Sequence, residues 1–159
     1  MYFCIMKTLL VLSSWIIFMN LYAFAQNYTS IPLKKISGTY QGWTSQDMGG
    51  NEVFYKTMFK IKANKDQTVK GQSTFYSIED STQILVVYNF EGKYEINTQT
   101  LRLKEYEVVK KTKDWVFCFK EMPLICTIND KTSKLELIGT WTAKNCPNTG
   151  GKIRVIKQK

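Results

Sequence analysis

The chain alternates apolar and polar residues over most of its length, which is the pattern of half-buried β-strands. From Val53 to Lys62, apolar or ring-bearing side chains take every second position and lysines take most of the others. Polar, turn-forming segments separate such stretches, and helical periodicity is nearly absent. The side chains expected to face inward are Tyr40, Val53, Tyr55, Thr57, Phe59, Ile61, Val69, Gly71, Ser73, Phe75, Ile84, Val86, Tyr88, Phe90, Gly92, Tyr94, Ile96, Leu101, Leu103, Glu105, Leu135, Leu137, Gly139, Trp141, Ile153 and Val155.

Three of these segments carry a glycine two residues before a large ring, at Gly38-Thr39-Tyr40, Gly92-Lys93-Tyr94 and Gly139-Thr140-Trp141. A glycine within a strand marks a bend or a close backbone approach, and the ring two positions on shares its face. We interpret these units as devices that curve a sheet. With no helical crossovers between strands, the pattern predicts an all-β fold, an antiparallel meander of eight to ten strands that closes into a barrel. A two-sheet sandwich would show the same periodicity.

The pattern predicts a hairpin between residues 115 and 128. Trp115, Phe117 and Phe119 alternate with Val116, Cys118 and Lys120, and the chain is expected to turn around Met122-Pro123.

The first 25 residues have the organisation of a secretory signal peptide. A positively charged start, Met1 to Lys7, precedes an apolar stretch from Thr8 to Met19 and the small-x-small site Ala23-Phe24-Ala25. We expect cleavage after Ala25, a secreted or periplasmic protein, and no transmembrane anchor after cleavage. The expected division is a signal peptide (1–25), an N-terminal extension (26–35) and a single β-barrel domain (36–159).

The net charge is positive, with 22 lysines and arginines against 13 acids, or +9. Cleavage removes one lysine, Lys7, and no acid, which leaves +8. The basic residues are scattered along the strands and turns, so we interpret them as a solvated face and expect no specific nucleic-acid partner.

The absence of histidine limits the chemistry. It excludes Ser-His-Asp and Cys-His catalysis and every histidine-based metal site. No phosphate-binding or calcium loop is recognisable, and the three cysteines left after cleavage lack a fourth zinc ligand. We therefore expect no cofactor, no metal and no enzymatic activity, although acids, lysines and tyrosines could still act.

Glu105 is an unusual inward residue because its parity places it with Leu101 and Leu103 in the core. A buried carboxylate needs a partner, so Glu105 either orients a ligand or is a satisfied structural group. The inward rings likewise line a pocket or fill the barrel, and their number favours a packed or nearly packed interior. The candidate ligand-binding residues are Tyr40, Tyr55, Ser73, Tyr88, Tyr94, Glu105 and Trp141.

The opening Gly38-Thr39-Tyr40, the repeated glycine and ring units and the short turns make residues 36–157 resemble the calycin group, the lipocalin-like and avidin-like meander barrels. In lipocalins the opening motif is Gly-x-Trp, and a basic residue on the closing strand packs across the barrel bottom. The nearest matches are Tyr40 or Trp43, and Arg154. The resemblance implies a barrel fold that can hold a ligand, but it does not identify the ligand.

The ending Leu137-Ile138-Gly139-Thr140-Trp141, followed by Cys146-Pro147 and a glycine pair, also resembles small secreted proteins of Bacteroidota, which implies a compartment but no activity.

Two pairings of the cysteines are considered. A symmetric turn at Met122 would oppose Cys118 and Cys126 across a hairpin, at a separation somewhat long for a relaxed disulfide. The pairing of Cys118 with Cys146 would tie the hairpin to the turn before the closing strand. This pairing also agrees with the cysteine placement in the secreted proteins that the chain resembles. We therefore prefer it, which leaves Cys126 as a buried thiol.

These features predict a non-catalytic binding barrel for a small apolar or saccharide-like ligand. The alternative is an envelope interaction or inhibitor-type barrel with a packed interior, which binds a protein partner through loops and outer rings such as Trp43 and Tyr106.

Overall fold

The computed structural model describes residues 30–47, 50–114 and 116–159, and the barrel described below is the compact unit Ile31–Lys159. The expected signal peptide, residues 26–29 of the expected extension and Trp115 lie outside the described residues. Within the described part of the chain, no helix has the length and apolarity to cross a bilayer. The elements are a short 3₁₀ helix η1 (Leu33–Lys35) and the strands β1 (Gly38–Asp47), β2 (Glu52–Ala63), β3 (Thr68–Tyr76), β4 (Ile84–Glu95), β5 (Thr100–Lys111), β6 (Lys120–Ile128), β7 (Leu135–Ala143) and β8 (Gly150–Lys157).

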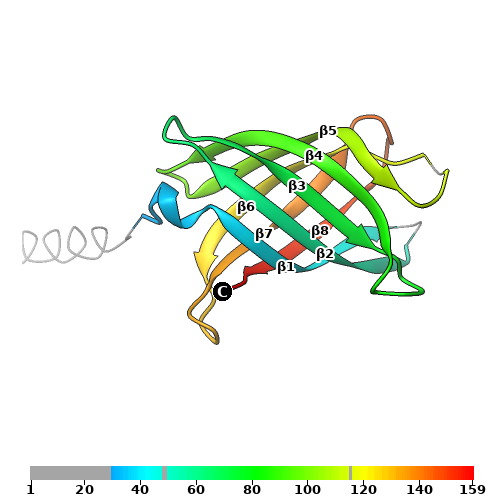
Figure 1. Cartoon of the computed structure of the whole chain (residues 1–159), viewed down its shortest axis with the longest axis horizontal. Coiled ribbons are helices and arrows are strands. Elements are labelled where there is room, and N and C mark those ends of the chain that lie inside the picture. The colour runs from blue at the N-terminus through cyan, green and yellow to red at the C-terminus, as the bar shows by residue number, and fades with distance from the viewer. Residues whose placement is uncertain (1–29, 48–49, 115) are drawn as a thin grey trace, which may run out of the picture. The chain divides into compact units, whose positions relative to one another are not determined.

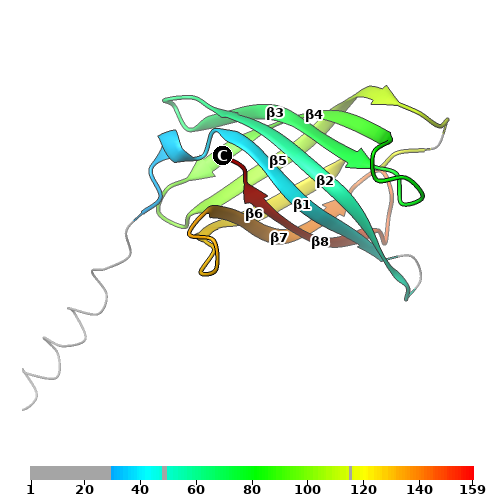
Figure 2. The ribbon, with the colours of Figure 1, turned by 60° about the horizontal axis from the view of Figure 1, so that its bottom comes forward.

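The eight strands form a closed antiparallel meander barrel (Figure 1). Each strand pairs with the next along the chain, and β8 pairs with β1, where Gly42 lies opposite Val155. The turned view shows the C-terminal strand lying against β1 and completing the wall (Figure 2). The predicted all-β barrel is confirmed, at the lower end of the expected strand number, and the sandwich is excluded.

The alternating pattern produces the wall in the way the sequence predicts. In β2, Thr57, Phe59 and Ile61 are buried, while the lysines between and beside them are exposed. A Cβ on Gly92 would collide with the carbonyl oxygen of Arg102, and one on Gly139 with that of Pro123. These two glycines therefore let neighbouring strands approach closely, which supports their interpretation as curvature devices.

Residues 31–36, just before β1, close one end of the barrel. Ile36 is fully buried, and its carbonyl oxygen accepts a 2.6 Å hydrogen bond from the Tyr40 hydroxyl. The Tyr94 hydroxyl donates to the carbonyl oxygen of Ile31 over 2.9 Å, and burial raises the pKa of Tyr94 to about 12. Two of the candidate ligand-binding tyrosines therefore bind the chain itself at this closed end.

The predicted turn at Met122-Pro123 is wrong, because β6 runs through both residues without a break. Its inward side chains are Lys120, Met122, Leu124 and Cys126, all buried. The chain from 112 to 119 precedes the strand as a connection, so the parity of its rings does not continue into β6. Lys120 shares the inward face of β6 with Met122 and Leu124.

The structure contains a disulfide between Cys118 and Cys146, with a Cα–Cα distance of 5.7 Å, which confirms the preferred pairing. It joins the β5–β6 connection to the β7–β8 connection at the end of the barrel away from η1. Cys126 is the free cysteine of the described chain, and burial raises the pKa of its thiol to about 12. The thiol is therefore protonated at neutral pH and poorly reactive.

Candidate functional site

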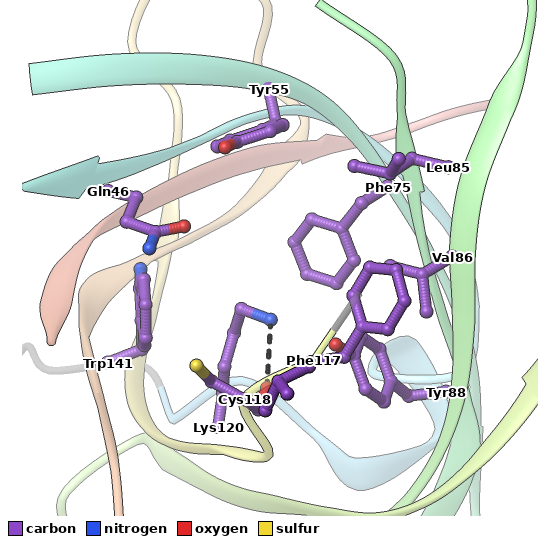
Figure 3. A pocket seen from close by; sticks show the side chains of 11 residues that line it. Gln46, Tyr55, Phe75, Leu85, Val86, Tyr88, Phe117, Cys118, Lys120 and Trp141 are labelled. Carbon is purple, nitrogen blue, oxygen red and sulfur yellow. Dashed lines mark hydrogen bonds between the residues drawn. The ribbon is translucent and has the colours of Figure 1, made fainter. Parts of the chain in front are cut away.

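The end of the barrel opposite residues 31–36 holds a pocket of about 310 Å³. Four connections surround this end, which we call the mouth: those between β1 and β2, β3 and β4, β5 and β6, and β7 and β8. Most of the pocket wall is aromatic or aliphatic (Figure 3). The lining residues are Gln46, Tyr55, Phe75, Leu85, Val86, Tyr88, Val116, Phe117, Cys118, Lys120 and Trp141.

An irregularity in β4 supplies two neighbouring apolar side chains to this wall. Phe75 pairs with Val86, whereas the next residue, Tyr76, pairs with Ile84, so Leu85 is an extra residue in the ladder. In a regular strand Leu85 and Val86 would point to opposite faces, but a bulge re-aims one of them. Both line the pocket, which explains why this part of β4 is apolar at successive positions.

Lys120 is the one charged side chain among the described residues that line the pocket. Its ammonium nitrogen lies 4.1 Å from the ring centre of Phe75, 4.7 Å from that of Tyr88 and 5.2 Å from that of Trp141. In Figure 3 the amine projects between Trp141 on one side and the other two rings on the other. Ring faces stabilise a cation, which partly compensates the charge for its lost hydration.

Glu105 lies beneath Lys120 and pairs with it. Its Oε2 is 3.5 Å from the Lys120 ammonium and accepts a 3.0 Å hydrogen bond from the Lys120 backbone N–H. Its Oε1 accepts a hydrogen bond of 2.5 Å from the Ser73 hydroxyl. Burial lowers the pKa of Lys120, and the Glu105 carboxylate opposes that shift. Both carboxylate oxygens of Glu105 therefore have hydrogen-bond partners within the barrel.

Tyr88 presents a hydroxyl to the pocket that has no hydrogen-bond partner among the described residues. Its ring packs edge-to-face against Phe75, Phe117 and Phe119, with centroids 5.8 to 6.4 Å apart. Burial raises the pKa of this phenol, and the nearby Glu105 charge adds to the shift. The hydroxyl stays protonated and can donate to a bound molecule.

The candidate residues from the sequence fall into three groups. Tyr55, Tyr88 and Trp141 line the pocket; Ser73 and Glu105 bind each other below it; Tyr40 and Tyr94 lie at the closed end. Sequence reasoning missed Lys120, which the period-two series Lys120, Met122, Leu124 and Cys126 could have revealed. The interior, which was expected to be packed or nearly packed, has a pocket of about 310 Å³ at the mouth.

Asn145 and the disulfide hold the β5–β6 connection over the pocket. The Asn145 side chain accepts a 2.9 Å hydrogen bond from the Phe119 backbone N–H and donates one of 3.1 Å to the Phe117 carbonyl oxygen. The adjacent Cys146 binds Cys118, a residue of the pocket wall. The position of Phe117 therefore depends on a covalent link between two connections.

We expect the double variant Cys118→Ser/Cys146→Ser to unfold at lower denaturant concentration. Closing a loop with a sequence separation of 28 residues restricts the unfolded chain, which predicts a loss of about 2–4 kcal/mol in the free energy of unfolding. Urea unfolding under identical buffer conditions measures the loss. Cys126→Ser serves as a control that leaves the disulfide intact, and an unchanged midpoint for the double variant would contradict the prediction.

No protein-family model matches the chain, and no curated protein matches it either. The described residues contain no cluster of three or more acids or cysteines suited to a metal ion.

Proposed function

We propose that this protein is an exported binding barrel that holds one small apolar or saccharide-like ligand in its mouth. The observation that carries the proposal is the combination of a packed, closed end with a pocket of about 310 Å³ at the other end. That volume lies within the range of about 300–1,000 Å³ typical of small-molecule sites, and most of the wall is aromatic or aliphatic. An eight-stranded barrel is wide enough to hold one such ligand.

Two observations support export. The N-terminal 25 residues have the organisation of a signal peptide, and the described barrel contains a disulfide. Structural disulfides persist in oxidising compartments, such as the periplasm or the extracellular space, and are rare in the cytosol.

Native mass spectrometry of protein purified from its own host tests the binding function. We expect a reproducible bound mass that Val86→Phe removes, because a larger side chain at a pocket position occupies the ligand's volume. The matched control is Val109→Phe, since Val109 is exposed and does not line the pocket. A wild-type protein that is empty in every preparation contradicts the proposal, as does a bound mass that survives Val86→Phe.

A patch on the outer wall favours the alternative, a protein-binding barrel. Trp43 packs edge-to-face against the exposed Phe54, with ring centroids 5.4 Å apart. Arg154 lies between Trp43 and Ile138 in the ladder, and Ile138 lies opposite the exposed Ile125. A photo-crosslinker placed at Phe54 should give one discrete product in the native host if this patch binds a partner, and no discrete product if it does not.

A further inference from the structure

The pocket already contains a balanced pair of charges at its base. The side chains of Lys120 and Glu105 are 10% and 0% exposed, and no other charged residue is among those that line the pocket. An ammonium and a carboxylate paired in this way carry no net charge. A charged ligand would therefore leave one uncompensated charge beside a buried pair and a mostly apolar wall, which is costly.

The polar groups that face the pocket have hydrogen atoms left to donate. The Lys120 ammonium has three N–H groups and two protein acceptors, Glu105 Oε2 at 3.5 Å and the Cys118 carbonyl oxygen at 3.4 Å, both long contacts. The Tyr88 hydroxyl has no partner among the described residues. A ligand with an oxygen acceptor would satisfy donors that have no partner in the described part of the chain.

The remaining wall carries two further polar side chains, Gln46 and Tyr55, and is otherwise apolar (Figure 3). Phe75, Leu85, Val86 and Phe117 offer carbon surface, and the indole N–H of Trp141 is already donated to the Ser45 carbonyl oxygen over 2.7 Å. The ring of hydroxyls on a saccharide would lose hydration here and find few partners, at a cost for each unpaired group. The wall therefore favours a mainly apolar molecule over a sugar.

We infer that the pocket takes an uncharged, mainly apolar ligand with an oxygen acceptor, such as a carbonyl oxygen, which accepts hydrogen bonds from the Lys120 amine and the Tyr88 hydroxyl. This inference rests on the proposed function and names the chemical class of its ligand. The role of Glu105 is to neutralise Lys120 and so to exclude carboxylates, which an unpaired lysine would attract.

A set of probes with the same shape and different charge tests the inference. Acetophenone is uncharged with a carbonyl oxygen, benzoate is an anion, benzamidinium is a cation, and α-methylstyrene lacks the oxygen. Titration is followed by NMR through the Trp141 indole N–H resonance, assigned with Trp141→Phe, because that group lies in the pocket wall. We expect the Kd of acetophenone to be lower than that of each other probe by about tenfold or more.

Two variants separate the roles of the charged pair. Glu105→Gln keeps an acceptor for Ser73 and removes the carboxylate charge, so benzoate should bind at least about tenfold more tightly than it binds the wild type. Lys120→Met should weaken the binding of acetophenone by a similar factor while leaving the Kd of α-methylstyrene unchanged. Glu95→Gln and Lys104→Met are matched controls, since both residues form ion pairs on the outer surface and neither lines the pocket.

The outcomes distinguish this inference from the proposed function. Tightest binding of benzoate or benzamidinium to the wild type overturns the inference and leaves a small-molecule pocket in place. Equal binding of acetophenone and α-methylstyrene also overturns it, because the oxygen would then have no donor. If no probe shifts the Trp141 signal at saturation, the inference fails, and the bound mass in native spectrometry decides separately on the binding function.

Discussion

Glu105→Leu is expected to lower the free energy of unfolding at neutral pH by about 3–5 kcal/mol, because it leaves the buried Lys120 charge without its partner. The substitution also removes the acceptor of the Ser73 hydroxyl and of the Lys120 backbone N–H. Urea unfolding followed by circular dichroism measures the loss. The matched control is Glu95→Leu, which breaks the exposed pair with Arg102 and should cost less than about 1 kcal/mol.

The loss in Glu105→Leu should depend on pH. Burial lowers the pKa of Lys120, and Glu105 is the group that opposes this shift, so its removal lowers the pKa of the amine further. A folded-state pKa below the ordinary value of 10.5 means that folding releases a proton from Lys120 in the pH range between the folded and the unfolded pKa. The difference from wild type should therefore shrink as the pH rises from about 7 toward 10.5. A loss that is small or independent of pH would show that Lys120 is not a buried, paired cation.

The second large effect is expected for Trp141→Ala, with a loss of about 3–5 kcal/mol in the free energy of unfolding. Trp141 is 2% exposed, and its indole N–H binds the Ser45 carbonyl oxygen on β1. Its ring also covers the Lys120 amine. The alanine variant enlarges the pocket and should weaken binding of small probes, as measured by urea unfolding and by titration with acetophenone.

Two ring variants separate packing from hydrogen bonding. Trp141→Phe keeps an aromatic wall but leaves the Ser45 carbonyl oxygen unpaired, so we expect a loss of about 1–3 kcal/mol. Trp43→Ala removes a ring of the same type from the outer wall and should cost less than either substitution at position 141. If Trp43→Ala proves as costly as Trp141→Ala, the distinction between the inner and outer rings is incorrect.

Much of the barrel could be predicted from sequence because one physical rule governs it. Side chains alternate across a strand, so the burial of Thr57, Phe59 and Ile61 follows from their spacing, and Glu105 could be assigned to the interior in the same way. The alternation rule gave a wrong result in β6, because the start of that strand was misplaced. Placing a turn at Met122-Pro123 hid the fact that Lys120 shares the face of Met122 and Leu124.

Which rings line the pocket was not predictable from alternation. Tyr40, Tyr94 and Trp141 each follow a glycine and each face inward, yet two lie at the closed end and one lies at the mouth. The difference arises from the direction of each strand and from the segment 31–36, which occupies one end only. Period-two patterns indicate whether a side chain points into or out of the barrel, but not its position along the barrel axis.

By itself, the sequence determined the all-β class, the antiparallel meander and the inward faces of most strands, because these depend on local alternation and short connections. Closure into a barrel, and not a two-sheet sandwich, was decided by the pairing of β8 with β1. The tertiary structure alone decided that Lys120 meets Glu105, that three rings surround its amine, and that the interior is filled at one end and hollow at the other. These features join residues from different strands, and their spacing depends on strand register, on the bulge at Leu85 and on the chain segment that closes the barrel. The glycine and ring units curve the wall, while the volume left inside it is a property of the assembled barrel.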